Sequence, residues 1–333
     1  MKIVMIGHSG VGKTTYIASL YGALQAKNNG FSLRTDVLSD HHKLIGLSEQ
    51  IKKGVYPDAT AIRSEYKFRL YHDSGEDIKF RWADYRGDAV TSEMENEQAS
   101  KLHKDIRKAD GVMLFFDCEL LDISRCRNKE KIKFSRQLGR IIVLLGKVFN
   151  SVKHDIFLSI VLTKSDIICR FSEYHLRHFE GLVETINAND YIHGSFIPIS
   201  CGLNNKNIEM PLLFTLSRAV EYKLRSLSKK ANSHKKAAEQ WEEKSSGLGG
   251  FWREVKDNIN GEKTDKQKAK GSSLKYHKKR RKYRALKKTV NSLNTYIQTI
   301  PVMTPEKDMQ LYTNCCNGMG AHNFTFNNLN GFS

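Results

Sequence analysis

The feature that most limits how this chain can fold is the eight-residue stretch Gly7–Thr14, GHSGVGKT. It fits the pattern G-x-x-x-x-G-K-[ST] in full, it follows an apolar run at Lys2–Ile6, and it precedes a segment with helical spacing. Glycines let a backbone wrap around phosphate groups with its N–H groups pointing inward, and the following helix N-terminus adds a favourable dipole. This context predicts a strand, a phosphate-binding loop (a P-loop) and a helix at the start of an α/β fold.

Apolar periodicity predicts the remaining elements. We expect strands at 66–71, 78–82, 111–116, 156–162 and 196–199, and helices at 13–25, 40–53, 90–108, 130–149, 172–187 and 210–230. Alternation of strands and helices is typical of a mostly parallel sheet with helices on both faces, which is a three-layer fold. The turn-rich residues 73–76 join two of the strands as a hairpin, so one strand should run antiparallel.

Charge divides the chain into two parts. The 333 residues carry 54 Lys and Arg against 36 Asp and Glu, a formal net charge of +18. Residues 223–290 hold 22 of these cations and 7 of the anions, whereas most apolar runs lie in the first two-thirds. We therefore expect a P-loop domain over 1–225 and a basic appendage over 231–333 that is partly helical and partly disordered.

Cysteine spacing and hydropathy predict a cytoplasmic location. The six cysteines match neither a disulfide scaffold nor a CxxC metal site. No stretch approaches the roughly 20 apolar residues of a spanning helix, and the apolar start of the chain is too short for a signal peptide.

The P-loop pattern assigns roles to individual side chains. Lys13 would neutralise the β- and γ-phosphates of a nucleotide, and the Thr14 hydroxyl would bind Mg²⁺. The phosphate-binding residues predicted from this motif are Gly7, His8, Ser9, Gly10, Val11, Gly12, Lys13, Thr14 and Thr15.

The tetrapeptide Thr163-Lys164-Ser165-Asp166 follows an apolar strand and is suited to select a base. The Asp166 carboxylate can accept two hydrogen bonds from the N1–H and N2–H₂ edge of guanine. Adenine has no proton at N1, so it would leave this charge unpaired. The aliphatic stem of Lys164 can lie over the base plane.

With these stretches in the same order and at strand ends, the sequence resembles the Ras-like GTPases over about 1–225. Asp84-Tyr85-Arg86-Gly87 looks like their DxxG motif, Thr60 like their switch I threonine, Thr163–Asp166 like their [NT]KxD motif, and Ser200-Cys201-Gly202 like their SAK-type base contact. The resemblance implies that Asp84 and Thr60 serve the Mg²⁺ site, that the Gly87 N–H contacts the γ-phosphate, and that Ser200 and Cys201 contact the base. More narrowly, the chain resembles bacterial double-GTPases, which often lie in prophage or defence gene neighbourhoods.

Two positions depart from the Ras-like pattern. Asp88 stands where the family often has the glutamine that orients water, and Ser9 stands where it usually has glycine. Either change would slow hydrolysis, so the resemblance implies a slow reaction supported by Lys13, Thr60, Gly87 and Asp88. Arg86 could act as a cis arginine, although a solvated or salt-bridged arginine is the favoured interpretation.

These observations predict an Mg²⁺-dependent GTP/GDP-binding switch with slow GTPase activity that reports to a protein partner, in a defence or signalling system. Two alternatives stay open: an ATP-dependent P-loop protein, and a nucleotide-locked scaffold whose basic tail does the work. Residues 231–290 could be a solvated or protein-docking helix, a nucleic-acid-binding arm, or a segment that binds an anionic membrane.

Overall fold

The structure, a computed structural model, describes residues 1–27, 30–58, 63–73, 77–85, 87, 97–121, 128–168, 173–203, 205–246, 250, 253–254, 256–257, 260 and 262–298. The described chain divides into two compact units. The first contains the described residues of Met1–Asp73, Asp77–Ala219 and 292–298, and the second contains those of Val220–Asn291.

A seven-stranded sheet forms the centre of the first unit, with the strand order β2-β3-β4-β1-β5-β6-β7. Its strands are β1 (Lys2–Gly7), β2 (Phe31–Thr35), β3 (Ser64–His72), β4 (Ile78–Asp84), β5 (Gly111–Asp117), β6 (Ile156–Thr163) and β7 (Ile192–Pro198). β3 pairs antiparallel with β2 and β4, and all the pairs from β4 to β7 are parallel. The predicted mostly parallel sheet with one antiparallel strand is therefore confirmed for the described strands.

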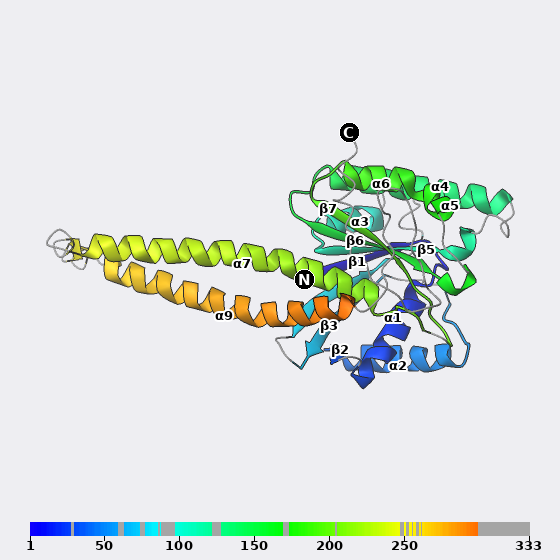
Figure 1. The fold of residues 1–333 in the computed structure, drawn as a ribbon, viewed down its shortest axis with the longest axis horizontal. Helices are drawn as coiled ribbons and strands as arrows, with labels where there is room; N and C mark the ends of the chain where they lie inside the picture. Colours follow the sequence, from blue (N-terminus) through cyan, green and yellow to red (C-terminus); the bar gives the residue numbers. More distant parts are fainter. Residues whose placement is uncertain are drawn as a thin grey trace. The chain divides into compact units, whose positions relative to one another are not determined.

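Helices cover both faces of this sheet and complete the three predicted layers (Figure 1). They are α1 (Lys13–Ala23), α2 (Leu38–Lys52), α3 (Glu97–Ile106), α4 (Asn128–Phe149), α5 (Glu173–Leu176), α6 (Glu180–Asn187) and α7 (Met210–Ser245), with short 3-10 turns η1 (Leu24–Ala26), η3 (Cys118–Leu120), η4 (Ser165–Ile167) and η5 (Arg177–Phe179). α4 and α6 lie on one side, and α1 and α2 lie on the other. Each central strand is covered on both faces, which explains why the strands are continuous apolar runs.

Alternation along β5 shows how the two faces hold the helices. Val112 and Leu114 join the buried cluster that α3, α4 and α6 complete. Phe115 points to the other face, where its ring centroid lies 5.2 Å from that of Tyr16 on α1. Tyr16 also packs edge-on against Trp82 of β4 at 5.9 Å. These contacts fix α1, and with it the P-loop, against the sheet.

Some element boundaries differ from the sequence prediction. The five residues of β2 were not predicted, because a strand this short at the sheet edge has too few residues to show a period. β7 begins at Ile192 rather than at 196, since His193 and Gly194 interrupt its apolar pattern. The helix expected over 172–187 is divided into α5, η5 and α6.

The helix expected at 210–230 is α7, which continues to Ser245. Its second half is polar and belongs to the second unit, so the apolar pattern that defines its first half does not extend along it. The helix expected at 90–108 is described from Glu97 to Ile106.

The second unit is a pair of helices that run side by side in opposite directions (Figure 1). α9 (Asp265–Gln298) returns along α7, and the Nζ atom of Lys268 lies 5.0 Å from the ring centroid of Trp241. A capping box starts α9, because Thr264 and Gln267 each accept the main-chain N–H of the other at 3.3 Å. Residues 299–333 of the expected appendage lie outside the described residues.

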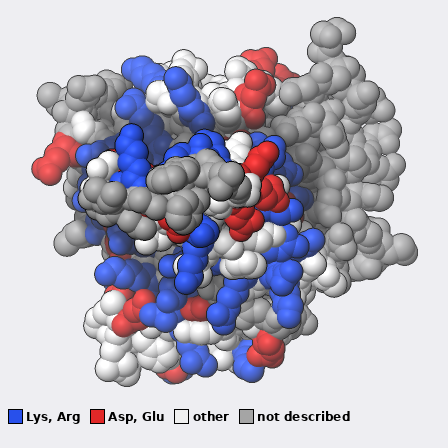
Figure 2. Space-filling model, turned by 90° about the vertical axis from the view of Figure 1, so that its left-hand side faces the viewer, with Lys and Arg blue, Asp and Glu red and all other residues white. Residues whose placement is uncertain are grey.

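Positive charge prevails on the described surface. Figure 2 shows Lys and Arg spread over one face, with smaller groups of Asp and Glu between them. Between Lys266 and Gln298 the sequence has 12 Lys and Arg and no Asp or Glu. None of the helices in the described part of the chain has both the length and the apolar character required to cross a membrane.

Asp105 of α3 joins three distant parts of the first unit. Its carboxylate accepts hydrogen bonds from Lys2 at 2.5 Å, Tyr85 at 2.7 Å and Arg63 at 3.1 Å. Burial acts to raise the pKa of Asp105. The hydrogen bond from Lys2, followed by the contacts with Tyr85 and Arg63, outweighs burial and leaves this pKa below its ordinary value.

We expect Asp105→Asn to lower the free energy of unfolding by about 2 kcal/mol at pH 7, because an amide cannot neutralise Lys2 and Arg63. A lowered pKa contributes stability above the unfolded value of about 4, and this contribution is lost as the pH falls through the folded value. The difference between wild type and variant should therefore shrink in urea titrations below pH 4. Asp190→Asn, at an exposed position, is the control. A difference that stays constant from pH 7 to pH 3 would contradict this role.

Candidate functional site

The P-loop lies between the end of β1 at Gly7 and the start of α1 at Lys13. Gly10 and Gly12 have φ angles of 82° and 86°, in the left-handed region that favours glycine. No side chain caps the start of α1. The N–H groups at a helix N-terminus can bind an anion, and the helix dipole favours negative charge there.

Lys13 is held inside this loop. Its side chain is buried, and Nζ donates hydrogen bonds to the carbonyl oxygens of Gly7 at 2.7 Å and His8 at 2.8 Å. Burial lowers the pKa of Lys13, and the charge of Asp84 acts in the opposite direction. A buried ammonium of this kind gains most from an added negative charge.

Asp84 ends β4 beside the loop and is 2% exposed. Its Oδ1 atom has no hydrogen-bond partner among the described residues. Burial raises its pKa to about 6, although Lys13 and Lys43 act to lower it. A buried carboxylate oxygen without a donor among the described residues fits the hard oxygen ligands that Mg²⁺ prefers. Asp84 and Thr14 would hold the ion directly or through its waters.

Gly87 packs directly on the P-loop. A Cβ atom placed on Gly87 would lie 2.0 Å from the main-chain nitrogen of Ser9, so no larger residue fits without movement. The fourth position of the DYRG stretch therefore contacts the part of the loop that would face the terminal phosphate.

Thr163 ties the predicted base-binding segment to the P-loop. Its hydroxyl donates to the carbonyl oxygens of Val11 at 2.9 Å and Phe116 at 3.0 Å. Because Thr163 is buried, this hydroxyl provides hydrogen bonding for two main-chain carbonyl groups, one in the P-loop and one in β5. The predicted base-binding segment and the P-loop are thereby linked.

Lys164 adopts a left-handed conformation, with φ 53°, and its ammonium is held by two carboxylates. Nζ lies 2.6 Å from Asp117 and 3.1 Å from Glu119. Burial acts to lower the pKa of Lys164, but the contacts with Asp117 and Glu119 outweigh it and raise this pKa. The anchored ammonium leaves the aliphatic stem along the cavity, as a stem that covers a base plane requires.

The far end of the cavity is formed by η4 and the turn after β7. Asp166 lies on η4 and is exposed, and Cys201 lines the cavity beside it. Burial, followed by the charge of Asp166, raises the pKa of Cys201 to about 12, so its sulfur stays a neutral thiol. Tyr56 approaches this turn, because a Cβ atom on Gly202 would lie 2.6 Å from the Tyr56 hydroxyl.

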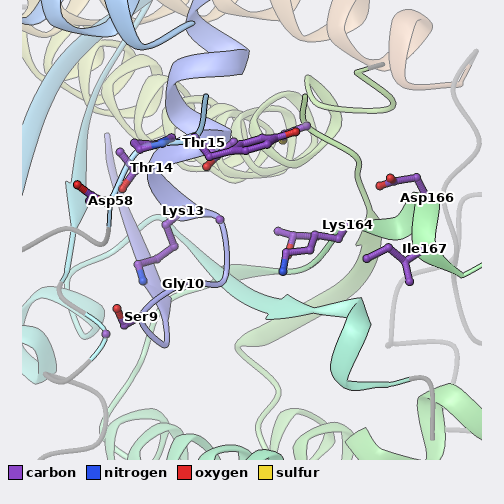
Figure 3. Close-up of a pocket in the computed structure, with 15 residues that line it drawn as sticks. Ser9, Gly10, Lys13, Thr14, Thr15, Asp58, Lys164, Asp166 and Ile167 are labelled. Atoms are coloured by element: carbon purple, nitrogen blue, oxygen red, sulfur yellow. The ribbon is translucent and has the colours of Figure 1, made fainter. Parts of the chain in front are cut away.

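These parts surround one cavity of about 460 Å³ (Figure 3). Ser9, Lys13 and Thr14 lie toward one end, and Lys164, Asp166 and Ile167 lie toward the other. Among the predicted residues, the cavity is lined by Ser9, Gly10, Gly12, Lys13, Thr14, Thr15, Gly87, Thr163, Lys164, Asp166 and Cys201.

Other predicted residues lie elsewhere. The Val11 side chain is buried, and its carbonyl oxygen accepts the Thr163 hydroxyl. His8 borders a second cavity, described below. The main chain of Ser200 bonds with that of Lys206, beside the lining residue Cys201. Thr60, Arg86 and Asp88 lie outside the described residues, and the roles of all these residues stay predictions.

Sequence reasoning did not select three lining residues, Pro57, Asp58 and Ile167. Asp58 lies close to Thr14 in the close-up (Figure 3). The sequence could have suggested Asp58 only by its position, two residues before Thr60 in the same loop. A single carboxylate in a loop forms no motif by which it could be recognised.

Residues 4–138 match the family described as Double-GTPase 1. The matched segment contains the P-loop and Asp84–Gly87, so the resemblance to double-GTPases and to P-loop GTPases predicted from the sequence is confirmed there. It identifies this segment as a GTP-binding protein of the GTPase type. No curated protein gives a significant sequence match to the chain.

Three solved structures are similar to the chain at low sequence identity. Nucleolar GTP-binding protein 1 from Plasmodium falciparum is 11% identical, with a TM-score of 0.37 over 68% of this chain and 89% of that chain. The signal recognition particle receptor SRb-GTP/SRX complex from Chaetomium thermophilum is 13% identical, with a TM-score of 0.34 over 57% and 83%. The S. cerevisiae Ski7 GTPase-like domain bound to GTP is 14% identical, with a TM-score of 0.35 over 62% and 44%.

We expect Thr163→Val to lower the free energy of unfolding by about 2 kcal/mol, because two buried carbonyl oxygens lose their donor while the volume is kept. Guanine nucleotide affinity should fall at least about tenfold, since the two halves of the cavity lose their link. Fluorescent-nucleotide titration and urea unfolding measure both effects. Thr185→Val removes a similar hydroxyl bond, to Gly181 at 2.7 Å on α6, and should leave nucleotide affinity unchanged. Equal losses of affinity in the two variants would contradict the link.

Proposed function

We propose that the protein is an Mg²⁺-dependent GTP-binding switch that hydrolyses GTP slowly. One observation supports this most strongly. A single cavity of about 460 Å³ has the P-loop at one end and the Thr163–Asp166 segment at the other, so phosphates and base have matching places in it. The family match over residues 4–138 points to the same class.

In this proposal the phosphates take over contacts that the loop now makes with itself. Lys13 exchanges its bonds to the Gly7 and His8 carbonyls for the β- and γ-phosphate oxygens. The N–H groups at the start of α1 bind the same anion. Thr14 and Asp84 would hold Mg²⁺, which would neutralise charge on the phosphates.

Selection of guanine rests on Asp166. The carboxylate is exposed toward the cavity end and can accept two hydrogen bonds from guanine, whereas adenine presents an unprotonated N1. The Lys164 stem covers one face of the base, and Tyr56 stands across the opening near Gly202. This arrangement favours GTP and GDP over ATP.

The switch would operate through the DYRG segment. The Gly87 N–H is proposed to contact the γ-phosphate, and its close packing on Ser9 makes it sensitive to whether that phosphate is present. Slow hydrolysis is proposed because Ser9 and Asp88 replace residues that the Ras-like pattern uses there. A partner would read the switch in a defence or signalling system, in the cytoplasm.

The basic helix α9 is the proposed docking surface for that partner, which would be a protein with an acidic face. The cations Lys275, Lys278, Lys279, Arg281, Lys282 and Arg284 make no ion pair with a described residue. Their charges are therefore available to a partner, and association should depend on salt.

We expect GTP and GDP to bind at least about a hundredfold more tightly than ATP, roughly 2.7 kcal/mol. Asp166→Ala should reduce this preference to less than about tenfold, while Asp58→Ala, on the same cavity, should retain it. Competition binding with purified protein and Mg²⁺ measures the preference, and single-turnover assays measure the slow hydrolysis. Equal binding of ATP by the wild type would make the ATP-dependent alternative correct. Tight GTP binding without turnover, even with a partner, would favour a locked scaffold.

Reversing four charges on α9, at Lys278, Lys279, Arg281 and Lys282, to Glu should weaken binding of a poly-glutamate peptide at least about tenfold at low salt. The matched control reverses four exposed lysines of the first unit, Lys67, Lys79, Lys104 and Lys147. If a nucleic-acid duplex or phosphatidylserine vesicles bind the wild type more tightly than the peptide does, the partner belongs to that class instead.

A further inference from the structure

A second cavity, of about 600 Å³, adjoins the nucleotide cavity. Ser9 and Gly87 line both cavities and are in direct contact with each other. Because Ser9 belongs to the P-loop and Gly87 ends the DYRG stretch, the two cavities meet where the terminal phosphate would lie. The remaining walls of the second cavity come from His8 and from α4.

The α4 wall is strongly basic. Lys129, Lys133, Arg136 and Arg140 follow one another at intervals of four, three and four residues, so they share one face of the helix. All four line the cavity, and none of the described residues that line it is acidic. Within the described part of the chain, no ion pair involves Lys129, Lys133 or Arg136. Like charges at this spacing repel one another, and a bound anion would relieve that repulsion.

His8 adds a polar group to the inner wall. The side chain is 7% exposed, and its buried Nε2 atom has no hydrogen-bond partner in the part of the chain that the structure describes. Burial lowers the pKa of His8 to about 4; the main chain of Gln137 acts against this, and the charges of Lys13, Arg140 and Lys133 add to it. His8 is therefore neutral at pH 7, and its free nitrogen can bond a protonated oxygen of the bound anion.

Solvated cations on a helix need no ligand, but the four cations of α4 that line this cavity differ from such cations in two respects. The charges converge on a hollow rather than on a convex surface, and the hollow contains a buried nitrogen that lacks a partner. A small tetrahedral oxyanion matches both, since it carries negative charge and, as hydrogenphosphate, a proton that it can donate.

We propose that this second cavity binds the inorganic phosphate that GTP hydrolysis releases, before the phosphate reaches solvent. The inference rests on the proposed GTPase function. In that reaction the oxygen of water bonds to the γ-phosphorus and the bond to the β-phosphate oxygen breaks. GDP and hydrogenphosphate are formed, and one proton passes to solvent. The hydrogenphosphate then moves past Ser9 and Gly87 to Lys133, Arg136 and His8.

The first test is a titration of the full-length, GDP-loaded protein with inorganic phosphate at low salt. The double variant Lys133→Ala/Arg136→Ala should bind phosphate at least about tenfold more weakly than wild type, about 1.4 kcal/mol. Lys147→Ala/Arg107→Ala removes the same charge at two exposed positions outside both cavities and should stay within about twofold of wild type. Lys133→Arg/Arg136→Lys keeps the charges and should retain binding.

The second test separates cleavage from release in a single turnover of GTP. Acid quenching measures GDP formation, and a phosphate sensor measures free phosphate. The wild type should show a lag between the two, which Lys133→Ala/Arg136→Ala should shorten at least threefold without changing the cleavage rate.

The outcomes distinguish the two proposals. If GTP is cleaved but phosphate binding and the lag are the same in Lys133→Ala/Arg136→Ala as in the control Lys147→Ala/Arg107→Ala, the phosphate site is wrong and the GTPase function stands. If GTP is not cleaved at all, the proposed function fails and the product site fails with it.

Discussion

Two buried charged groups, the Lys13 ammonium and the Asp84 carboxylate, determine which ligands the candidate site at this edge of the sheet can bind. Both are buried near the ends of the neighbouring strands β1 and β4. Lys13 donates to two carbonyl oxygens, and one oxygen of Asp84 has no donor among the described residues. Burial lowers the pKa of Lys13 and raises the pKa of Asp84, and both shifts favour the neutral form of the group. Buried charges of this kind are costly unless other charges or polar groups compensate them. Phosphate and Mg²⁺ are complementary to both charges.

The rest of the first unit holds these charges in place. Tyr16 packs against Trp82 and Phe115 behind the P-loop, and Thr163 bonds the main chain on the open side. Rigid support on both sides lets a loop with two left-handed glycines keep one conformation. Discrimination between bases can then depend on one carboxylate at a defined distance along the same cavity.

The sequence was sufficient to predict the elements with long apolar periods and the motifs at their ends. β1, β5 and β6 are continuous apolar runs, and the P-loop has fixed spacing, so both could be found without coordinates. β2 could not, because an edge strand of five residues depends on its pairing with β3 rather than on its own period. The start of α9 had a readable signal in Thr264 and Gln267, whose spacing is that of a capping box. The second cavity was not predictable, since its walls come from the P-loop and α4, which are more than a hundred residues apart.

The last turns of α9 belong to the first unit, and this has a consequence for synthesis on the ribosome. Leu293 and Ile297 are buried, the Asn294 side chain contacts Ser217, and the Tyr296 ring lies 5.9 Å from Phe31 of the edge strand. The first unit therefore includes residues 265 positions apart, from 31 to 296. When every strand of the sheet has emerged from the ribosome, the residues at the end of α9 have not yet been released. The first unit is therefore complete only after the basic helical pair has also emerged. During that interval the face that receives Leu293 and Ile297 is open. A chaperone, or another part of the chain that has already emerged, could bind there.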